Sequence, residues 1–243
     1  MTVFQQYIAL GDSISISFYA SMDYMEKHQV SNPPDGLGAA MLFYKNNDEV
    51  WPKFKQRDLS SLYPQLQLCY HASDGATTTT VLDNQLPELS AGSKEQTIIT
   101  MTVGGNNLLF MMGKSQAQGD DLFKKLIENL EQILQKINLL FPNNILILGT
   151  VYDPSDNCPD IMWRNYKRDH IWFYRYNDIV REICEKRKNY ILADIHKLCY
   201  GHGYSAGEKN WFYATIEPGV IAAHEIRRLW LKELHNYNSQ RKQ

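Results

Sequence analysis

Short runs of apolar residues alternate along the chain with longer segments in which apolar residues recur at helical spacing. The apolar runs predict strands at residues 7–10, 67–71, 97–103, 145–150 and 190–193. Helical spacing predicts helices at residues 37–45, 77–86, 121–141, 171–188 and 219–235. Strands that alternate with helices form parallel crossover units. The pattern therefore predicts an α/β fold, a three-layer α/β/α sandwich with a parallel sheet of about five strands.

Length and composition fit one such domain over residues 1–243. The chain has 243 residues, of which 44% are hydrophobic and 21% are charged, close to the averages of globular proteins. Residues 15–30 show no clean period and are expected to form a loop or a short helix. Residues 108–113 are apolar, so they either line a pocket or belong to the core.

Small polar residues follow the first three predicted strands. The first strand is followed by Gly11-Asp12-Ser13, the second by Ser73-Asp74-Gly75, and the third by Gly104-Gly105-Asn106-Asn107. The carboxyl ends of parallel strands meet at one edge of the sheet, where open α/β folds bind their ligands. We therefore expect Ser13, Gly75 and Asn106 to meet at that edge, with the Ser13 hydroxyl presented to a ligand.

These three motifs, in this order, resemble those of the SGNH/GDSL hydrolases. The resemblance implies an SGNH/flavodoxin-like fold and a GDSL-type serine esterase or lipase that cleaves a lipid, acetyl or other acyl ester. It also implies that Ser13 is the nucleophile of an acyl-serine mechanism. The oxyanion hole would be formed by the backbone N–H groups of Ser13 and Gly75 and by the Asn106 side chain, donors that need no reorganisation. Asn107 stands where the family usually has aspartate.

The fourth motif departs from the family pattern. Members of the family usually carry Asp-x-x-His before the last helix, with the histidine as general base. Here Ala214 stands at the aspartate position and Glu217 at the histidine position, in an alignment anchored by Pro218-Gly219 and the helix that follows. Both usual partners of the serine are therefore replaced.

A different histidine is the first alternative for the base, because the pKa of histidine lies near neutrality. We predict His202, since its flanking glycines allow unusual backbone angles and it precedes the Glu217 motif in the same crossover. His196 and His224 are second choices, and a site without a histidine base is a further alternative. Glu217 would orient the imidazole, as the third member of a triad does, or serve as a structural acid.

Three functions consequently stay open. The first is a serine ester hydrolase, the second is a pseudoenzyme that keeps the pocket and binds an acyl ligand, and the third is an interaction protein that retains only the fold. The sequence does not identify the ester. The expected partner is a small-molecule acyl ester, with no cofactor, and the sequence carries no sign of oligomeric state.

Charge and targeting features exclude other classes of partner. The formal net charge is −2, which gives no reason to expect nucleic-acid binding. No signal peptide or transmembrane segment is evident, and the four cysteines are widely spaced. We therefore expect reduced thiols in a cytoplasmic protein, although a specialised secretion signal would not be visible here.

The long loop at residues 151–169 carries Asp153, Asp156 and Asp160, but their spacing matches no known cation loop, and we predict no metal site.

Overall fold

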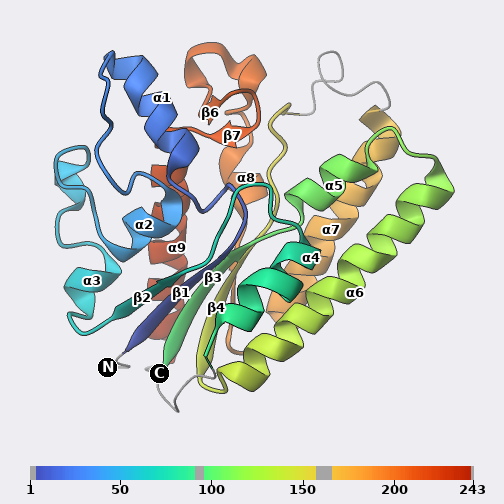
Figure 1. Ribbon diagram of the computed structural model, residues 1–243, viewed down its shortest axis with the longest axis horizontal. Coiled ribbons are helices and arrows are strands. Elements are labelled where there is room, and N and C mark those ends of the chain that lie inside the picture. Colours follow the sequence, from blue (N-terminus) through green and yellow to red (C-terminus); the bar gives the residue numbers. More distant parts are fainter. Residues whose placement is uncertain (1–3, 91–95, 157–165, 242–243) are drawn as a thin grey trace.

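The computed structural model describes residues 4–90, 96–156 and 166–241. Its centre is a parallel five-stranded sheet in the order β2-β1-β3-β4-β5 (Figure 1). The strands are β1 (Gln6–Gly11), β2 (Gln67–Tyr70), β3 (Thr97–Thr102), β4 (Asn144–Gly149) and β5 (Tyr190–Ala193). The predicted α/β fold with about five parallel strands is confirmed.

The apolar runs of the strands reflect burial on both faces of the sheet. In β1, Tyr7 and Ala9 belong to one buried cluster, whereas Ile8 and Leu10 belong to the other. Successive side chains of a strand point to opposite faces, so a strand covered on both sides needs apolar residues at every position. The sheet is therefore the middle of three layers.

Two groups of helices form the outer layers (Figure 1). One face is covered by α4 (Thr78–Thr80), α5 (Gly105–Met111), α6 (Gln116–Leu140) and α7 (Tyr166–Lys186). The other face is covered by α1 (Phe18–His28), α2 (Ala39–Tyr44), α3 (Leu59–Leu62), α8 (Ile195–Cys199) and α9 (Val220–Gln240). Short 3-10 helices lie at Pro52–Phe54, Leu86–Glu88 and Tyr204–Lys209.

The three long helices predicted from helical spacing are present as α6, α7 and α9, but their first and last residues differ from the predicted ones. Helix α6 starts before the predicted residue 121, because Ser115 accepts a hydrogen bond from the backbone N–H of Gln118 and forms a capping box with it. Helix α9 begins after Gly219, where the backbone N–H of Val220 donates to the buried Asp23 carboxylate at 2.8 Å. These caps satisfy N–H groups that lack partners inside the helix.

The predicted helix at residues 77–86 is instead an irregular segment. It consists of the short helix α4, a π-helical turn at Val81–Gln85 and the 3-10 turn Leu86–Glu88. Pro87 lacks a backbone N–H and so disfavours continuation of a regular helix. Residues 18–28, expected as a loop or a short helix, form the eleven-residue helix α1.

A small hairpin was not predicted from the sequence. The strands β6 (Phe212–Tyr213) and β7 (Glu217–Pro218) pair antiparallel, with Tyr213 opposite Glu217. The turn between them holds Ala214 and Thr215 at positive φ values of 44° and 76°. Figure 1 shows this hairpin above α9, at the end of the sheet where the strands finish.

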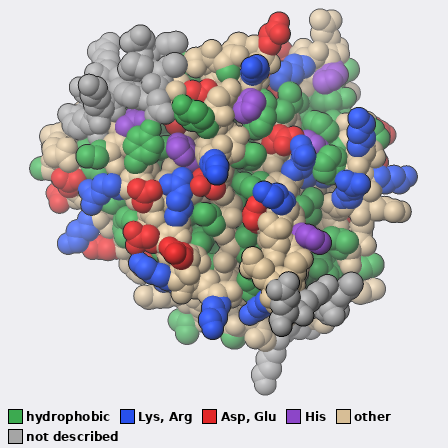
Figure 2. Space-filling model, turned by 180° about the vertical axis from the view of Figure 1, so that it is seen from behind, with side chains coloured by type: hydrophobic (Ala, Val, Ile, Leu, Met, Phe, Trp, Pro, Cys, Tyr) green, Lys and Arg blue, Asp and Glu red, His purple; other side chains and the backbone are tan. Residues whose placement is uncertain are grey.

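Other sequence expectations concern charge, cysteines and membrane segments. Acidic and basic side chains are interspersed on the face shown in Figure 2, which has no basic stripe. Cys69, Cys184 and Cys199 are free thiols, whereas Cys158 lies outside the described residues. Within the described ranges, no helix combines the length and apolar character needed to span a membrane.

Candidate active site

Ser13 lies on a tight turn directly after β1. The turn starts at Gly11, which has a φ of 110°, and a Cβ at this position would lie 1.8 Å from the carbonyl oxygen of Thr102. Only glycine fits such a close approach. The Asp12 backbone N–H then donates to the Thr102 carbonyl at 2.9 Å, and the Asp12 carboxyl accepts from the Ile14 backbone N–H at 3.2 Å. These contacts fix the backbone on both sides of Ser13.

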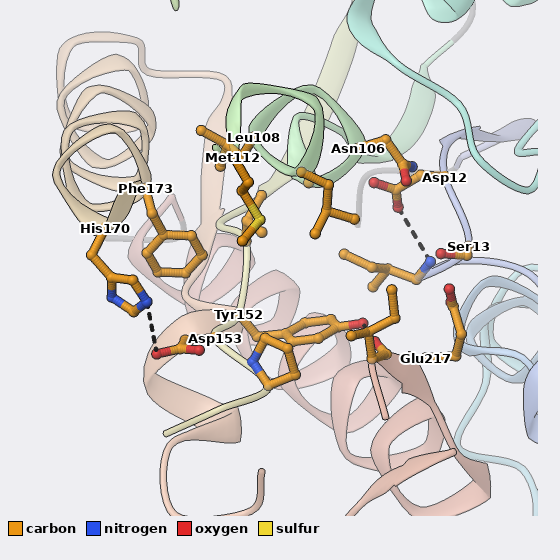
Figure 3. Close-up of a pocket in the computed structure, with 16 residues that line it drawn as sticks. Asp12, Ser13, Asn106, Leu108, Met112, Tyr152, Asp153, His170, Phe173 and Glu217 are labelled. Carbon is orange, nitrogen blue, oxygen red and sulfur yellow. Dashed lines mark hydrogen bonds and ion pairs between the residues drawn. The ribbon is translucent and has the colours of Figure 1, made fainter. Parts of the chain in front are cut away.

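A pocket of about 80 Å³ opens beside this turn. Ser13, Asp12, Asn106 and Glu217 lie at one end, and Asp153 and His170 lie at the other (Figure 3). The wall between them is mostly apolar and includes Leu108, Leu109, Met112 and Phe173. Residues 108–113 therefore serve both alternatives that the sequence left open: Leu108, Leu109 and Met112 line the pocket, whereas Leu108 and Met111 belong to the buried core.

The carboxyl group of Glu217 points toward Ser13 (Figure 3). Partial burial raises its pKa above the ordinary value of 4.5, a hydrogen bond with the Ser13 side chain lowers it, and the nearby Asp74 raises it further. The Oε2 atom of Glu217 is buried without a hydrogen-bond partner among the described residues. Glu217 thus presents a carboxyl group of raised pKa to the Ser13 hydroxyl.

The same turn carries a second carboxyl group, that of Asp12. Asp12 is 1% exposed, and burial raises its pKa from 3.8 to about 7, against the lowering effect of hydrogen bonds from the Thr102 side chain and the Ile14 backbone. The charge of Glu217 raises it further. The two carboxyl groups therefore disfavour simultaneous ionisation.

Asn106 is the second residue of helix α5 and connects the third motif to the second. Its Nδ2 donates to the carbonyl of Ala76 at 3.0 Å, and a side-chain amide has a second N–H to offer. The neighbouring Asn107 accepts the backbone N–H of Thr78 at 2.9 Å through its Oδ1. This bond needs only an oxygen acceptor, so asparagine serves as well here as the aspartate usual in the family.

Gly75 lies on the loop that Asn106 holds. It is exposed, has a φ of 66°, and is not among the residues that line the pocket. The preceding residue, Asp74, accepts a hydrogen bond from the Tyr19 hydroxyl and is close enough to Glu217 to raise its pKa. The loop therefore borders the Ser13 end of the pocket.

The structure does not bring His202 to Ser13. Its ring stacks on Trp211 with 3.5 Å between centroids, and its Nδ1 lies 2.9 Å from the carbonyl oxygen of Lys209. The Asp156 carboxylate accepts the backbone N–H groups of Gly201 and Gly203 at 3.0 and 2.6 Å. The flanking glycines thus serve a turn that packs against the loop after β4, and His202 is not among the pocket residues.

The second-choice histidines also lie outside the pocket lining. His224 stacks on Trp51 and accepts from the Arg227 side chain, and burial together with Arg227 lowers its pKa to about 3. His196 lies against Phe173, and burial lowers its pKa.

His170 lines the pocket, although it is not one of the three histidines that the sequence analysis considered as the base. It is 8% exposed, and its Nε2 lies 3.9 Å from the Asp153 carboxylate. Asp153 also accepts the backbone N–H and the hydroxyl of Ser155 at 2.9 and 2.6 Å. The position of Asp153 shortly after β4 was the one feature of the sequence that indicated functional residues at this end of the pocket.

The aspartates of the loop after β4 form no cation site in the part of the chain that is described. Asp153 and Asp156 have the partners given above, and Asp160 lies outside the described residues. No group of three or more histidine, cysteine or acidic side chains in the described ranges is arranged to hold a metal ion.

Solved structures similar to this one include ester hydrolases. The acetylxylan esterase Axe2 from Geobacillus stearothermophilus is 16% identical, with a TM-score of 0.62 over 96% of this chain and 95% of that chain. The lipase Lip_vut3 from a goat rumen metagenome is 16% identical, with a TM-score of 0.61 over 94% and 96%. The extracellular lipase of Streptomyces rimosus is 17% identical, with a TM-score of 0.58 over 96% and 99%. At these identities the likeness establishes the fold.

Sequence comparison identifies the family. No curated protein is significantly similar to the chain. Residues 9–215, however, match the GDSL-like lipase/acylhydrolase family, and this match covers the first three motifs but ends before Glu217. The chain therefore belongs to the GDSL-like lipase/acylhydrolase family of ester hydrolases.

Proposed function

We propose that this protein hydrolyses small carboxylic esters through an acyl-Ser13 intermediate, with Glu217 as the general base. The observation that carries the proposal is the contact between the Ser13 hydroxyl and the Glu217 carboxyl at the end of the pocket. A serine hydroxyl becomes a good nucleophile when an adjacent base takes its proton. Glu217 lines the pocket with its carboxyl group pointing toward that hydroxyl, and the Ser13 side chain is one of the groups that shift its pKa.

The raised pKa of Glu217 makes a carboxylate base reasonable. An ordinary carboxylate is a weak base at neutral pH, and catalytic carboxyls are commonly shifted upward by burial and by neighbouring acids. Burial and Asp74 have this effect on Glu217. The higher its pKa, the more readily the ionised group accepts a proton from Ser13.

The reaction then proceeds in two balanced halves. Ser13 Oγ attacks the ester carbonyl while its proton passes to Glu217, and the protonated Glu217 returns that proton to the departing alcohol. In the second half, Glu217 takes a proton from water as the water attacks the acyl-serine, and the proton returns to Ser13 Oγ as the acid leaves. Glu217 is an ionised carboxylate again at the end of each cycle.

Three N–H donors are proposed for the oxyanion. They are the backbone N–H of Ser13, the backbone N–H of Gly75 and the second N–H of the Asn106 side chain. The bond from Asn106 to Ala76 supports this arrangement, because it holds the amide and the Gly75 loop in a fixed relation. Donors held in place before the reaction stabilise developing charge without reorganisation.

The pocket favours short, uncharged acyl groups. Its volume of about 80 Å³ is small beside pockets for drug-sized ligands, and the wall of Leu108, Leu109 and Met112 is apolar. No lysine or arginine stands among the described lining residues, whereas Asp12, Asp153 and Glu217 do. An anionic acyl group would therefore meet carboxylates without a compensating cation. An acetyl ester, the substrate class named for the acetylxylan esterase above, fits these limits.

A fluorophosphonate probe tests the proposal, because it reacts covalently with an activated serine. We expect one probe per chain, mapped to Ser13 by peptide mass spectrometry, and turnover of p-nitrophenyl acetate that falls for longer acyl chains. Ser13→Ala should abolish both, and Ser15→Ala, on the same turn, is the matched control that should keep both. A folded wild-type protein that neither labels nor turns over short esters would point to the pseudoenzyme or the interaction protein instead.

A further inference from the structure

The buried side chain of Gln85 binds the backbone immediately before the Ser13 turn. Gln85 is 4% exposed and ends the π-helical turn Val81–Gln85. Its Oε1 accepts the backbone N–H of Gly11 at 2.8 Å, and its Nε2 donates to the carbonyl of Gly11 at 2.9 Å. One amide therefore satisfies both polar backbone groups of the same glycine.

The strand register shows why Gly11 needs this partner. On the β3 side, β1 stays paired as far as Gly11, which lies opposite Thr102. On the β2 side, the last pair is Ala9 with Tyr70. Strand β2 therefore ends before Gly11. The Gly11 carbonyl still accepts the backbone N–H of Ser73, but the acceptor for the Gly11 N–H is the Gln85 Oε1 rather than a residue of β2. Unpaired backbone groups are costly when buried, so this bidentate contact stabilises the last residue of β1.

The same side chain also reaches the loop that carries Gly75. Its Nε2 lies 3.2 Å from the hydroxyl of Ser73, and the Ser73 backbone N–H donates to the Gly11 carbonyl at 3.0 Å. Gln85 is therefore joined to both backbone segments that would supply oxyanion N–H groups, the Ser13 turn and the Gly75 loop. A π-helical turn is a rare feature that occurs frequently at functional sites.

We propose that Gln85 is a positioning residue for the reaction, which sets the Ser13 turn in register with the Gly75 loop. This inference rests on the proposed function and extends it to a residue outside the pocket. Small displacements of catalytic groups lower rates steeply. Loss of the Gln85 amide should therefore reduce the rate of attack by Ser13 much more than it weakens substrate binding.

Gln85→Leu and Gln85→Glu test the role of the amide. Gln85→Leu removes all three contacts, and we expect kcat for p-nitrophenyl acetate and the rate of fluorophosphonate labelling to fall on the order of 10-fold to 100-fold, with KM changed little. In Gln85→Glu, a protonated acid can still accept from Gly11 N–H and donate to the Gly11 carbonyl, whereas an ionised carboxylate cannot donate. The activity of Gln85→Glu relative to wild type should therefore rise as the pH falls.

Asn129→Leu is the matched control. Asn129 is buried on α6, 2% exposed, and its Nδ2 donates to the Thr79 hydroxyl at 3.0 Å, but it bonds neither Gly11 nor Ser73. The Asn129→Leu variant should have a lower Tm than wild type. Its kcat and its rate of fluorophosphonate labelling should stay close to the wild-type values when they are measured well below the Tm of each protein. An equal loss of kcat in Asn129→Leu, an unchanged kcat in Gln85→Leu, or a pH-independent ratio for Gln85→Glu would each overturn the proposal.

Hydrogen exchange separates this proposal from the proposed function. In Gln85→Leu, backbone amides of residues 11–16 and 73–76 should exchange faster than in wild type, whereas Asn129→Leu should leave them unchanged. If the wild-type protein neither labels nor hydrolyses esters, the proposed function fails, and the positioning of Ser13 by Gln85 is still decided by exchange. Unchanged exchange at both segments in Gln85→Leu would overturn it.

Discussion

The carboxyl group of Glu217 points toward Ser13 from the position where the resemblance to SGNH/GDSL hydrolases implied a histidine. The β6–β7 hairpin places it there, since Tyr213 pairs with Glu217 across the tight turn at Ala214 and Thr215. The carboxyl points toward the serine and its pKa is raised by burial. A short hairpin therefore places an acid beside the Ser13 hydroxyl, where the resemblance implied an imidazole.

Asn106→Ala should reduce kcat for short esters on the order of 100-fold to 1000-fold, the usual cost of removing one oxyanion donor. The comparison with Asn107→Ala separates this effect from damage to the loop, because Asn107 holds the backbone of Thr78 and is not a proposed donor. Steady-state kinetics of both variants, with Tm measured alongside, should show a large loss of kcat in Asn106→Ala only. Equal losses would assign the effect to loop geometry.

His202→Ala should retain fluorophosphonate labelling and ester turnover. The ring packs on Trp211 and contacts a backbone carbonyl, so its removal should cost stability, on the order of 1 kcal/mol. Thermal unfolding and labelling rates of the folded protein check this. Loss of labelling in a folded His202→Ala protein would restore histidine as the base and contradict the role given to Glu217.

Asp12→Asn should increase stability most at alkaline pH. The pKa of Asp12 is raised from 3.8 to about 7 in the folded protein, so between these values the folded state keeps a proton that the unfolded chain has lost. Stability therefore falls as the pH rises through this range, and the penalty is complete above about 7. Asparagine carries no such charge and removes a cost on the order of 4 kcal/mol at most.

Chemical denaturation of wild type and Asp12→Asn at pH 4, 6 and 8 measures this difference. The gain in free energy of unfolding should be smallest at pH 4 and largest at pH 8. A gain that does not change with pH would show that Asp12 ionises in the folded protein as it does in the unfolded chain.

The sheet and the three motifs after its first strands were accessible from the sequence, because they depend on local patterns. A strand such as β4 is buried on both faces and must be apolar throughout, and the turn at Gly11 requires glycine at that position. The β6–β7 hairpin was not accessible, since strands of two residues have no period. Likewise, Pro87 broke the regular helix expected at residues 77–86.

The choice of base could not be settled from local sequence. The glycines around His202 indicated backbone freedom, but its direction is set by Trp211 and by Asp156, which is 45 residues away from Gly201 along the chain. His170 reached the pocket through the packing of α7 beside β4, and a single histidine on an amphipathic helix does not reveal this. The contact between Gln85 and Gly11 likewise spans 74 residues.

The pH dependence of kcat/KM for p-nitrophenyl acetate in wild type, Glu217→Gln and Glu217→His tests most directly whether Glu217 is the base. Asp12 also lines this pocket and titrates. Measuring the same profiles in an Asp12→Asn background therefore isolates the fall in kcat/KM at low pH that comes from protonation of Glu217. The wild-type rate should fall as the pH drops through an apparent pKa above 4.5, the ordinary value. Glu217→Gln should lower kcat/KM on the order of 100-fold to 10,000-fold. Glu217→His should move the apparent pKa of the fall in kcat/KM at low pH toward about 6.5. Full activity in Glu217→Gln, with an unchanged acidic limb, would contradict the account.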